Sequence, residues 1–345
     1  MDCLKLAREI INGKRLTRGD DLSWMIDCDV KELRQGADQI RKALYGDKVD
    51  LCTIINGRSG RCAENCKFCA QSLHSRTDCE VYSLLDEDTI VRQAKSNQDE
   101  GVDRFAIVTS GKSPTPEDFE RIIHVFERMH KELNIELCCS LGFLTSEQFH
   151  RLHMAGVTSI HNNIETSRRF FPHICTTHTF DDKIANIKRA KAEGLCVCSG
   201  GIIGMGENWE DRIDMALTLS ELGIESIPIN SLMPIKGTPL ENNRRLTEDE
   251  ILRTVAIFRY INPEANIRLA GGRALMKENG IETFSSGASA SITGNMLTTS
   301  GSTIKSDQAM LKGLGRDVTP DWMLPVAERA DTAYRWDMQH AASQE

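Results

Sequence analysis

The feature that most constrains the fold of this chain is a regular alternation of short apolar, β-branched runs with helical segments, from about residue 49 to residue 315. Parallel strands need a long crossover connection, usually a helix, so this alternation is typical of repeated βα units around a parallel sheet. Eight such runs predict an α/β fold, a (βα)8 barrel of the TIM type. The predicted strands are 49–55, 104–109, 135–140, 159–164, 195–200, 226–230, 265–269 and 288–293.

Helical segments separate the predicted strands and keep the connections short, which favours one compact domain. Several begin with a capping pair, such as Thr145 with Gln148 or Thr247 with Glu250. The predicted helices are 87–100, 115–133, 145–155, 180–193, 208–222, 246–261 and 274–284. We expect residues 1–48 to form an N-terminal helical extension, residues 49–315 the barrel, and residues 316–345 a short C-terminal cover.

Composition argues against several classes of protein. The chain has 345 residues and a formal net charge of −8, which disfavours nucleic acid, because binding a phosphate backbone needs clustered Lys and Arg. No run of about 18 apolar residues could span a membrane, and the start of the chain lacks a signal-peptide pattern, so we expect a cytoplasmic protein. Twelve cysteines in a reducing compartment are expected to be thiols or metal ligands.

Three of these cysteines, Cys62, Cys66 and Cys69, follow the first predicted strand with the spacing Cys-x3-Cys-x2-Cys. Their loop would lie at the mouth of the barrel, where such folds carry their chemistry. Three thiolates can hold three irons of a [4Fe-4S] cluster and leave the fourth open for the amino and carboxylate groups of S-adenosylmethionine (SAM). The spacing therefore indicates a radical SAM enzyme, in which an electron from the cluster cleaves SAM to a 5′-deoxyadenosyl radical.

The alternative for this loop is a zinc-binding interaction module, which Cys-x2-Cys alone would favour. The longer spacing, Phe68 before the last cysteine and the lack of a second Cys/His pair nearby argue against zinc. GGIIGMGE (200–207) adds a glycine-rich turn that would let the backbone approach the adenine of SAM. Cofactor contacts are therefore expected from Phe68, Gly201, Ile203 and Glu207.

Longer stretches of the chain resemble the biotin synthase family, from about Val49 to Gly315. The resemblance implies that two radicals in turn abstract hydrogen from dethiobiotin and that sulfur comes from an auxiliary iron–sulfur cluster deep in the barrel. We also expect an electron donor such as flavodoxin or ferredoxin, and a homodimer. The matching stretches are GRSGRCAENCKFCAQS (57–72), HNNIETS (161–167), LCVCSGGIIGMGE (195–207), PINSLMPIKGTPL (228–240), IRLAGGRALM (267–276) and GNMLTT (294–299).

The resemblance also implies roles for single residues around the substrates. Asn163 and Glu165 match an Asn and an Asp that contact the ribose of SAM and the ureido ring of dethiobiotin, with Glu165 one methylene longer. Asn230 matches another dethiobiotin contact, although either Asn could instead be a strand-end turn residue. His178 stands where many relatives have an Arg that reaches the SAM carboxylate, and its alternative is an exposed loop histidine.

The chain departs from the family pattern at the auxiliary cluster, which three cysteines and an arginine hold as [2Fe-2S] in the well-known form. Ala106 replaces the cysteine of the second strand. Cys138, Cys198 and Arg268 match the remaining ligands. Two cysteines cannot hold that cluster in the usual way, so we expect either a rebuilt site or a protein without an auxiliary cluster, whose cysteines only fill the core.

Replacement ligands are available on neighbouring strands. Cys52 is on the first strand, beside the lost position, and Cys196 precedes Cys198 by two residues, so alternation points both sulfurs of that strand the same way. We expect Cys52, Cys196 or both to complete an altered cluster, of a four-iron type with an additional sulfide. Cys139 should point outward and pack against helices. The four cysteines without a motif, Cys3, Cys28, Cys79 and Cys175, are expected to be incidental.

Other radical SAM enzymes of the same subgroup are the main competing interpretation. The hydrogenase-maturation protein and methylornithine synthase rearrange or cleave carbon skeletons without inserting sulfur. The stretches 161–167 and 228–240 and the interior cysteines argue against them.

Overall fold

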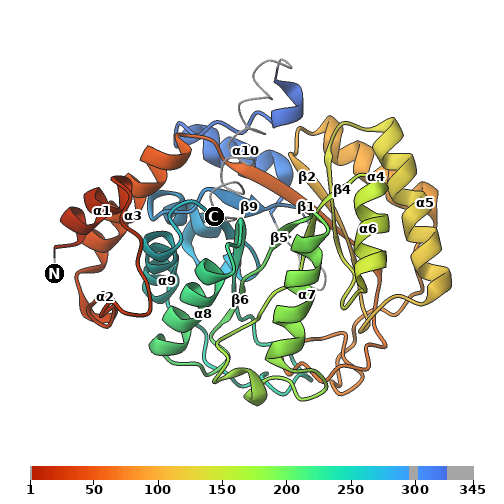
Figure 1. Ribbon diagram of the computed structural model, residues 1–345, viewed down its shortest axis with the longest axis horizontal. Helices are drawn as coiled ribbons and strands as arrows, with labels where there is room; N and C mark the ends of the chain where they lie inside the picture. The colour runs from red at the N-terminus through yellow and green to blue at the C-terminus, as the bar shows by residue number, and fades with distance from the viewer. Residues whose placement is uncertain (1, 295–301, 325–345) are drawn as a thin grey trace.

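The computed structural model describes residues 2–294 and 302–324. At its centre a parallel sheet has the strand order β5-β4-β3-β2-β1-β9-β8-β7-β6, and β5 also pairs with β7 (Figure 1). β5 (Cys196–Cys198) and β6 (Gly201–Ile203) are consecutive short strands that both pair with β7, so they share one position of the closed barrel. The predicted (βα)8 barrel is confirmed.

The other elements follow the predicted alternation closely. The remaining strands are β1 (Asp50–Arg58), β2 (Arg104–Thr109), β3 (Glu136–Ser140), β4 (Val157–His161), β7 (Ser226–Ser231), β8 (Asn266–Leu269) and β9 (Ala290–Ile292). The α-helices are α1 (Cys3–Ile11), α2 (Trp24–Asp27), α3 (Val30–Tyr45), α4 (Glu87–Asp99), α5 (Pro116–Glu132), α6 (Ser146–Met154), α7 (Phe180–Ala192), α8 (Trp209–Glu221), α9 (Glu248–Ile261) and α10 (Ile304–Gly313). Among the described residues, none of the helices has the length and apolar character that crossing a membrane requires.

The strand predicted over 195–200 is shorter in the structure, where β5 ends at Cys198, and an additional short strand, β6, follows at Gly201 in the glycine-rich stretch. Two glycines explain the course of the chain. A Cβ on Gly200 would lie 2.0 Å from the carbonyl oxygen of Pro228, and a Cβ on Gly201 would lie 2.3 Å from that of Glu165. These glycines are therefore required because neighbouring backbones approach them closely.

The prediction of one helix over 274–284 is wrong. The chain there forms two short 3-10 helices, Arg273–Leu275 and Lys277–Ser285. The second is interrupted where Glu278, Asn279 and Gly280 have φ angles of 45°, 52° and 89°. Successive residues in the left-handed region cannot continue a right-handed helix.

Side chains alternate between the barrel interior and the layer beneath the helices. On β2, Phe105 and Ile107 belong to the main hydrophobic core, whereas Ala106 lies in a small separate cluster with Cys52 and Cys138. Cys139 lies in the main core, as strand alternation predicted for it. The interior of the barrel is thus distinct from the apolar layer that holds sheet and helices together.

The floor of the barrel, at the amino ends of the strands, is covered by the described end of the C-terminal segment. Trp322 Nε1 donates to the carbonyl oxygen of Val102 at 2.9 Å, just before β2. Lys48 Nζ lies 3.0 Å from Asp321 and 3.4 Å from Asp103, just before β1. The opposite end of the barrel, where the strands finish, is therefore the end available for a site. Of the stretch 294–299, only Gly294 lies within the described residues.

The N-terminal helices α1 and α3 pack against α9 on the outside of the barrel (Figure 1). Tyr260 on α9 donates its hydroxyl to the carbonyl oxygen of Cys3 at 2.9 Å. Gly36 on α3 faces this hydroxyl so closely that a Cβ there would lie 1.9 Å from the oxygen. A small residue at position 36 therefore lets α3 approach α9.

We predict that Gly36→Ala lowers the unfolding midpoint, because the added methyl overpacks this contact, at a cost of about 1–3 kcal/mol. Tyr260→Phe alone should cost about 1 kcal/mol through the lost hydrogen bond. In the double variant the alanine should cost less than it does alone, since the clashing oxygen is gone. Gly313→Ala, where a Cβ meets nothing within 4 Å, is the control in thermal unfolding. Additive losses would contradict the steric explanation.

Candidate active site

The loop after β1 brings Cys62, Cys66 and Cys69 together at the mouth of the barrel. The loop folds back on itself, because the Cys62 amide donates to the Gln71 carbonyl at 3.1 Å and the Leu73 amide donates to the Cys62 carbonyl at 2.8 Å. All three cysteines are free and partly exposed. Burial raises the pKa of the Cys69 thiol to about 11, so a metal must displace that proton when it binds.

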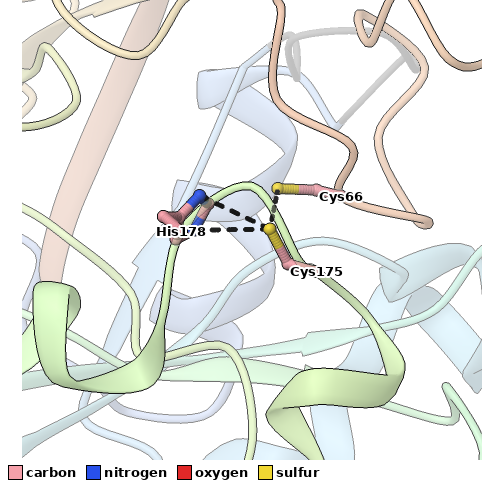
Figure 2. A group of neighbouring side chains, drawn as sticks. All are labelled: Cys66, Cys175 and His178. Atoms are coloured by element: carbon pink, nitrogen blue, oxygen red, sulfur yellow. Dashed lines mark hydrogen bonds between the residues drawn. The ribbon is translucent and has the colours of Figure 1, made fainter.

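Cys175 and His178 lie against this loop, as Figure 2 shows. Cys66 Sγ is 3.8 Å from Cys175 Sγ, which is 3.4 Å from Nδ1 of His178. Cys66, Cys175 and His178 form the only described group of three His, Cys, Asp or Glu side chains with ligand atoms within 4.8 Å of one another. The structure thus brings Cys175, which no motif marked, beside a mouth cysteine. Sequence spacing gave no signal for it, since 109 positions separate the two cysteines.

His178 is buried rather than an exposed loop residue, with 6% of its surface accessible. Its ring lies 5.1 Å from that of Phe143 and 5.6 Å from that of Phe171. The Glu64 carboxylate, two residues before Cys66, pairs with Nδ1. Burial lowers the pKa of His178, but hydrogen bonds with Cys175 and Glu64 outweigh it and raise the pKa above the ordinary value. A contact with the SAM carboxylate stays a prediction.

Glu165 follows β4 and combines backbone strain with an unsatisfied side chain. Its φ of 69° is unusual for a residue with a side chain, and two backbone hydrogen bonds, to Gly200 and from Ile202, hold it there. Oε2 is buried with no hydrogen-bond partner in the part of the chain that the structure describes, and Lys183 lies 4.0 Å from the other oxygen. Burial raises the pKa of this carboxyl to about 7.

The two predicted asparagines hold backbone at the ends of strands. Asn163 Oδ1 accepts from the amide of Gly200 at 3.1 Å. Asn230 Nδ2 donates to the carbonyl of Gly201 at 3.1 Å, and its Oδ1 accepts from the amide of Gly271 at 2.9 Å. These bonds give both residues a structural role, and their contacts with a substrate remain predictions.

The remaining predicted cofactor residues are packed into the chain itself. The Glu207 carboxylate accepts from the amides of Gly204 and Met205 at 2.7 and 2.8 Å and pairs with Arg212. Its helix, α8, begins two residues later. Ile203 is fully buried, and Phe68 packs against the core. Only backbone atoms of this turn can therefore face a ligand without repacking.

A second group of thiols lies inside the barrel, well below the mouth. Cys52, Cys138 and Cys198 come from β1, β3 and β5, and at most 3% of each is exposed. Burial raises the pKa of Cys138 to about 12 and that of Cys52 well above the usual range. Burial also raises the pKa of Cys198. Arg268 opposes the rise in both Cys52 and Cys198 without cancelling it.

Arg268 itself is engaged by the protein on every guanidinium nitrogen. Nε donates to Ser226 Oγ at 3.2 Å, and Nη2 donates to Asp50 Oδ1 at 2.6 Å. Nη1 donates to the carbonyl oxygens of Asp50 and Ser291 at 3.3 and 3.2 Å. The predicted arginine ligand is thus placed beside the thiols but held by backbone and carboxylate oxygens.

Cys196 lies nearer the floor of the barrel than Cys198. Its register partner on β4 is Ser159, and the charges that act on its pKa are those of Glu225, Arg104 and Glu136, with burial as the main cause of the rise. Of the interior thiols, Cys138 is among the main causes of this rise. Cys52, by contrast, is influenced by both Cys138 and Cys198.

His161 on β4 was not singled out as a site residue from the sequence. It lines the same interior pocket as Cys52, Cys198 and Arg268. Burial, with Arg268 and Arg104, lowers its pKa to about 3, so the imidazole is neutral at physiological pH. The strand position of this residue, in register with Cys198, could have revealed it.

These residues fit the groups that radical SAM chemistry requires. Three free thiols on one mouth loop suit a cluster with one open iron. The orphaned oxygen of Glu165 is costly to bury unless a ligand pairs with it. Inside the barrel, buried thiols face a pocket rather than filled core.

Comparisons with known proteins agree with this arrangement. The Radical SAM superfamily matches residues 58–219, and the Biotin and Thiamin Synthesis associated domain matches residues 228–317. Biotin synthase of Clostridium beijerinckii is 58% identical over 90% of this chain and 98% of its own length. Biotin synthase of Alkaliphilus metalliredigens is 56% identical over 91% of this chain and 99% of its own length.

The chain belongs to the biotin synthase family. It is a radical SAM enzyme, and its cofactors therefore include a [4Fe-4S] cluster and SAM. Among solved structures, methylornithine synthase has a TM-score of 0.80 at 20% identity and covers 95% of this chain and 99% of its own. A maturase of the [FeFe]-hydrogenase has a TM-score of 0.80 at 17% identity, over 96% of this chain and 77% of its own. These two likenesses concern the fold alone, whereas the biotin synthase relatives match in sequence.

We predict that Glu165→Gln becomes more stable relative to the parent chain as pH rises from 5 to 8. A carboxyl whose pKa rises from 4.5 to about 7 on folding keeps its proton in the folded state, so the parent chain loses stability across that interval. The loss is at most roughly 3 kcal/mol. Thermal midpoints, measured anaerobically at each pH, test this. Glu117→Gln, on the exposed face of α5, is the control, and an equal pH response of parent and Glu165→Gln would contradict the prediction.

Proposed function

We propose that this enzyme converts dethiobiotin to biotin, with sulfur supplied by an auxiliary cluster of altered type inside the barrel. The observation that carries the proposal is the presence of two separate thiol groups, one on the mouth loop and one in the interior pocket. The names of the sequence relatives support the product. A reaction that inserts sulfur needs both a radical source and a sulfur source, and two groups of thiols can hold both.

The mouth loop would hold the [4Fe-4S] cluster through Cys62, Cys66 and Cys69. When bound, this cluster supplies the electron that cleaves SAM to a 5′-deoxyadenosyl radical. Glu165, whose buried oxygen lacks a partner among the described residues, would accept a hydroxyl or N–H of a bound substrate. Asn163 and Asn230 would orient dethiobiotin from the strand ends. Flavodoxin or ferredoxin as electron donor and a homodimer remain part of the proposal.

The interior pocket would hold the auxiliary cluster through Cys52, Cys138 and Cys198. Three thiolates suit a four-iron cluster with one iron left for an additional sulfide. Cys52 is favoured over Cys196 as the third ligand, because Cys52 packs in one cluster with Ala106 and Cys138. Cys52 thereby supplies a sulfur beside the position where Ala106 lacks one.

The competing proposal is another radical SAM enzyme of the same subgroup that inserts no sulfur. It gives no reason for buried thiols, Cys52 and Cys198 among them, to line a pocket. In such an enzyme the interior cysteines would only pack, and their replacement would leave iron content unchanged.

The first experiment separates the two thiol groups. Cys66→Ala should abolish formation of 5′-deoxyadenosine, whereas Cys138→Ala and Cys198→Ala should retain it, bind less iron and sulfide, and make no biotin. Cys139→Ala is the matched control, since this neighbouring thiol lies in the outer core and its loss should cost on the order of 1 kcal/mol of stability. Unchanged iron and normal biotin in both interior variants would exclude the auxiliary site.

The second experiment identifies the third thiolate. Cys52→Ala should lose the auxiliary cluster spectrum and biotin formation, because only two of the three proposed thiolates remain. Cys196→Ala should keep both, because this thiol lies nearer the floor. Iron and sulfide content and Mössbauer spectra of anaerobic protein measure the difference. The reverse result would make Cys196 the ligand and Cys52 a packing residue.

A further inference from the structure

The interior pocket contains a histidine whose side chain has no function in the fold itself. His161 is the last residue of β4, and its neutral imidazole has no hydrogen-bond or ion-pair partner within residues 2–294 and 302–324. The neighbouring Ile160 packs into the outer core, so alternation directs His161 inward, where it lines the pocket. This imidazole is half-buried and lines the pocket without a partner among the described residues, so it is available to bind a ligand there.

Strand register places this residue between two of the proposed thiolates. β4 lies between β3 and β5 in the sheet. His161 is the register partner of Cys198 on β5, and Ser159, which precedes it on the same face, is the partner of Cys138 on β3. The imidazole therefore enters the pocket from the strand that separates the two sulfurs.

Arg268, which the family resemblance suggests as the nitrogen ligand, is less suited to that role here. Each of its guanidinium nitrogens already donates to an oxygen of Asp50, Ser226 or Ser291. A guanidinium held in this way would have to give up a hydrogen bond and a proton before binding iron. An imidazole nitrogen without a hydrogen-bond partner offers its lone pair without breaking a contact of the fold, and imidazole is an established ligand of iron–sulfur clusters.

We propose that His161, rather than Arg268, is the nitrogen ligand of the auxiliary cluster and binds the iron that Cys52, Cys138 and Cys198 leave free, the same iron that would carry the additional sulfide. The inference rests on the proposed function, since it requires a cluster in this pocket. Arg268 then acts as a positioning residue, whose charge faces the thiolates while its hydrogen bonds tie β8 to β1 and β9.

The test uses the full-length chain with Cys62, Cys66 and Cys69 changed to alanine, so that only the auxiliary cluster contributes to the spectrum. Protein labelled with ¹⁵N in histidine alone should show a directly bound nitrogen in pulsed electron paramagnetic resonance of the reduced cluster. Protein labelled with ¹⁵N in arginine alone should show no directly bound nitrogen. The labelling experiment needs no change at position 161, so it does not depend on the folding of a variant.

His161→Gln should lose this coupling, and Ser159→Ala, on the same face of the same strand, should keep it. A bound nitrogen from labelled arginine, or a cluster with full iron content and no coupling to labelled histidine, would overturn the assignment while leaving the auxiliary cluster in place. A triple-alanine chain that binds no iron would overturn the auxiliary cluster and this assignment together.

Discussion

The carboxylate of Asp50 lies between two guanidinium groups in the lower part of the barrel, and the polar interior depends on this arrangement. Arg104 Nε donates to one oxygen at 2.7 Å and Arg268 Nη2 to the other at 2.6 Å, which ties β1 to β2 and β8. Burial raises the pKa of Asp50, but the two arginines outweigh it and hold the pKa well below its usual range. An ionised carboxylate needs both partners here, because removing one would leave a buried charge uncompensated.

This charged layer also explains why the barrel retains a pocket. The interior of a TIM-type barrel is ordinarily filled by layers of branched apolar side chains. Here cysteine, serine, histidine and arginine occupy interior positions, and their side chains surround a space instead of filling it. Arg268 acts against the rise in pKa that burial causes in Cys52, and both arginines act against it in Cys198, although both pKa values stay raised. Positive charge favours the thiolates that iron requires, so the ionic layer and the proposed cluster site support each other.

The sequence predicted the fold well because strand and helix periodicity are local properties. The first and last residues of β2 were predicted correctly. The capping boxes at Thr145 and Thr247 begin α6 and α9 as expected. Errors arose where tertiary contacts override the local pattern. The strand ending near Gly200 and Gly201 was mispredicted, because the backbones of these glycines meet neighbouring backbone closely. The helix over 274–284 was mispredicted, because the chain adopts left-handed geometry up to Gly280. The mouth cysteines were evident from their spacing. Cys175 and His161 were not, because contact across the fold gives them their significance.

The two thiol groups keep a fixed separation because the same chain segments contribute to both levels of the barrel. β1 carries Cys52 in its interior and leads into the loop of Cys62. β4 carries His161 toward the pocket, and Glu165 follows four residues later at the mouth. Four residues span at most about 14 Å, so a small substrate bound between these levels can be near both. Because β1 and β4 lead directly from one level to the other, a substrate activated at the mouth would not need to leave the barrel to reach sulfur held in the proposed lower site.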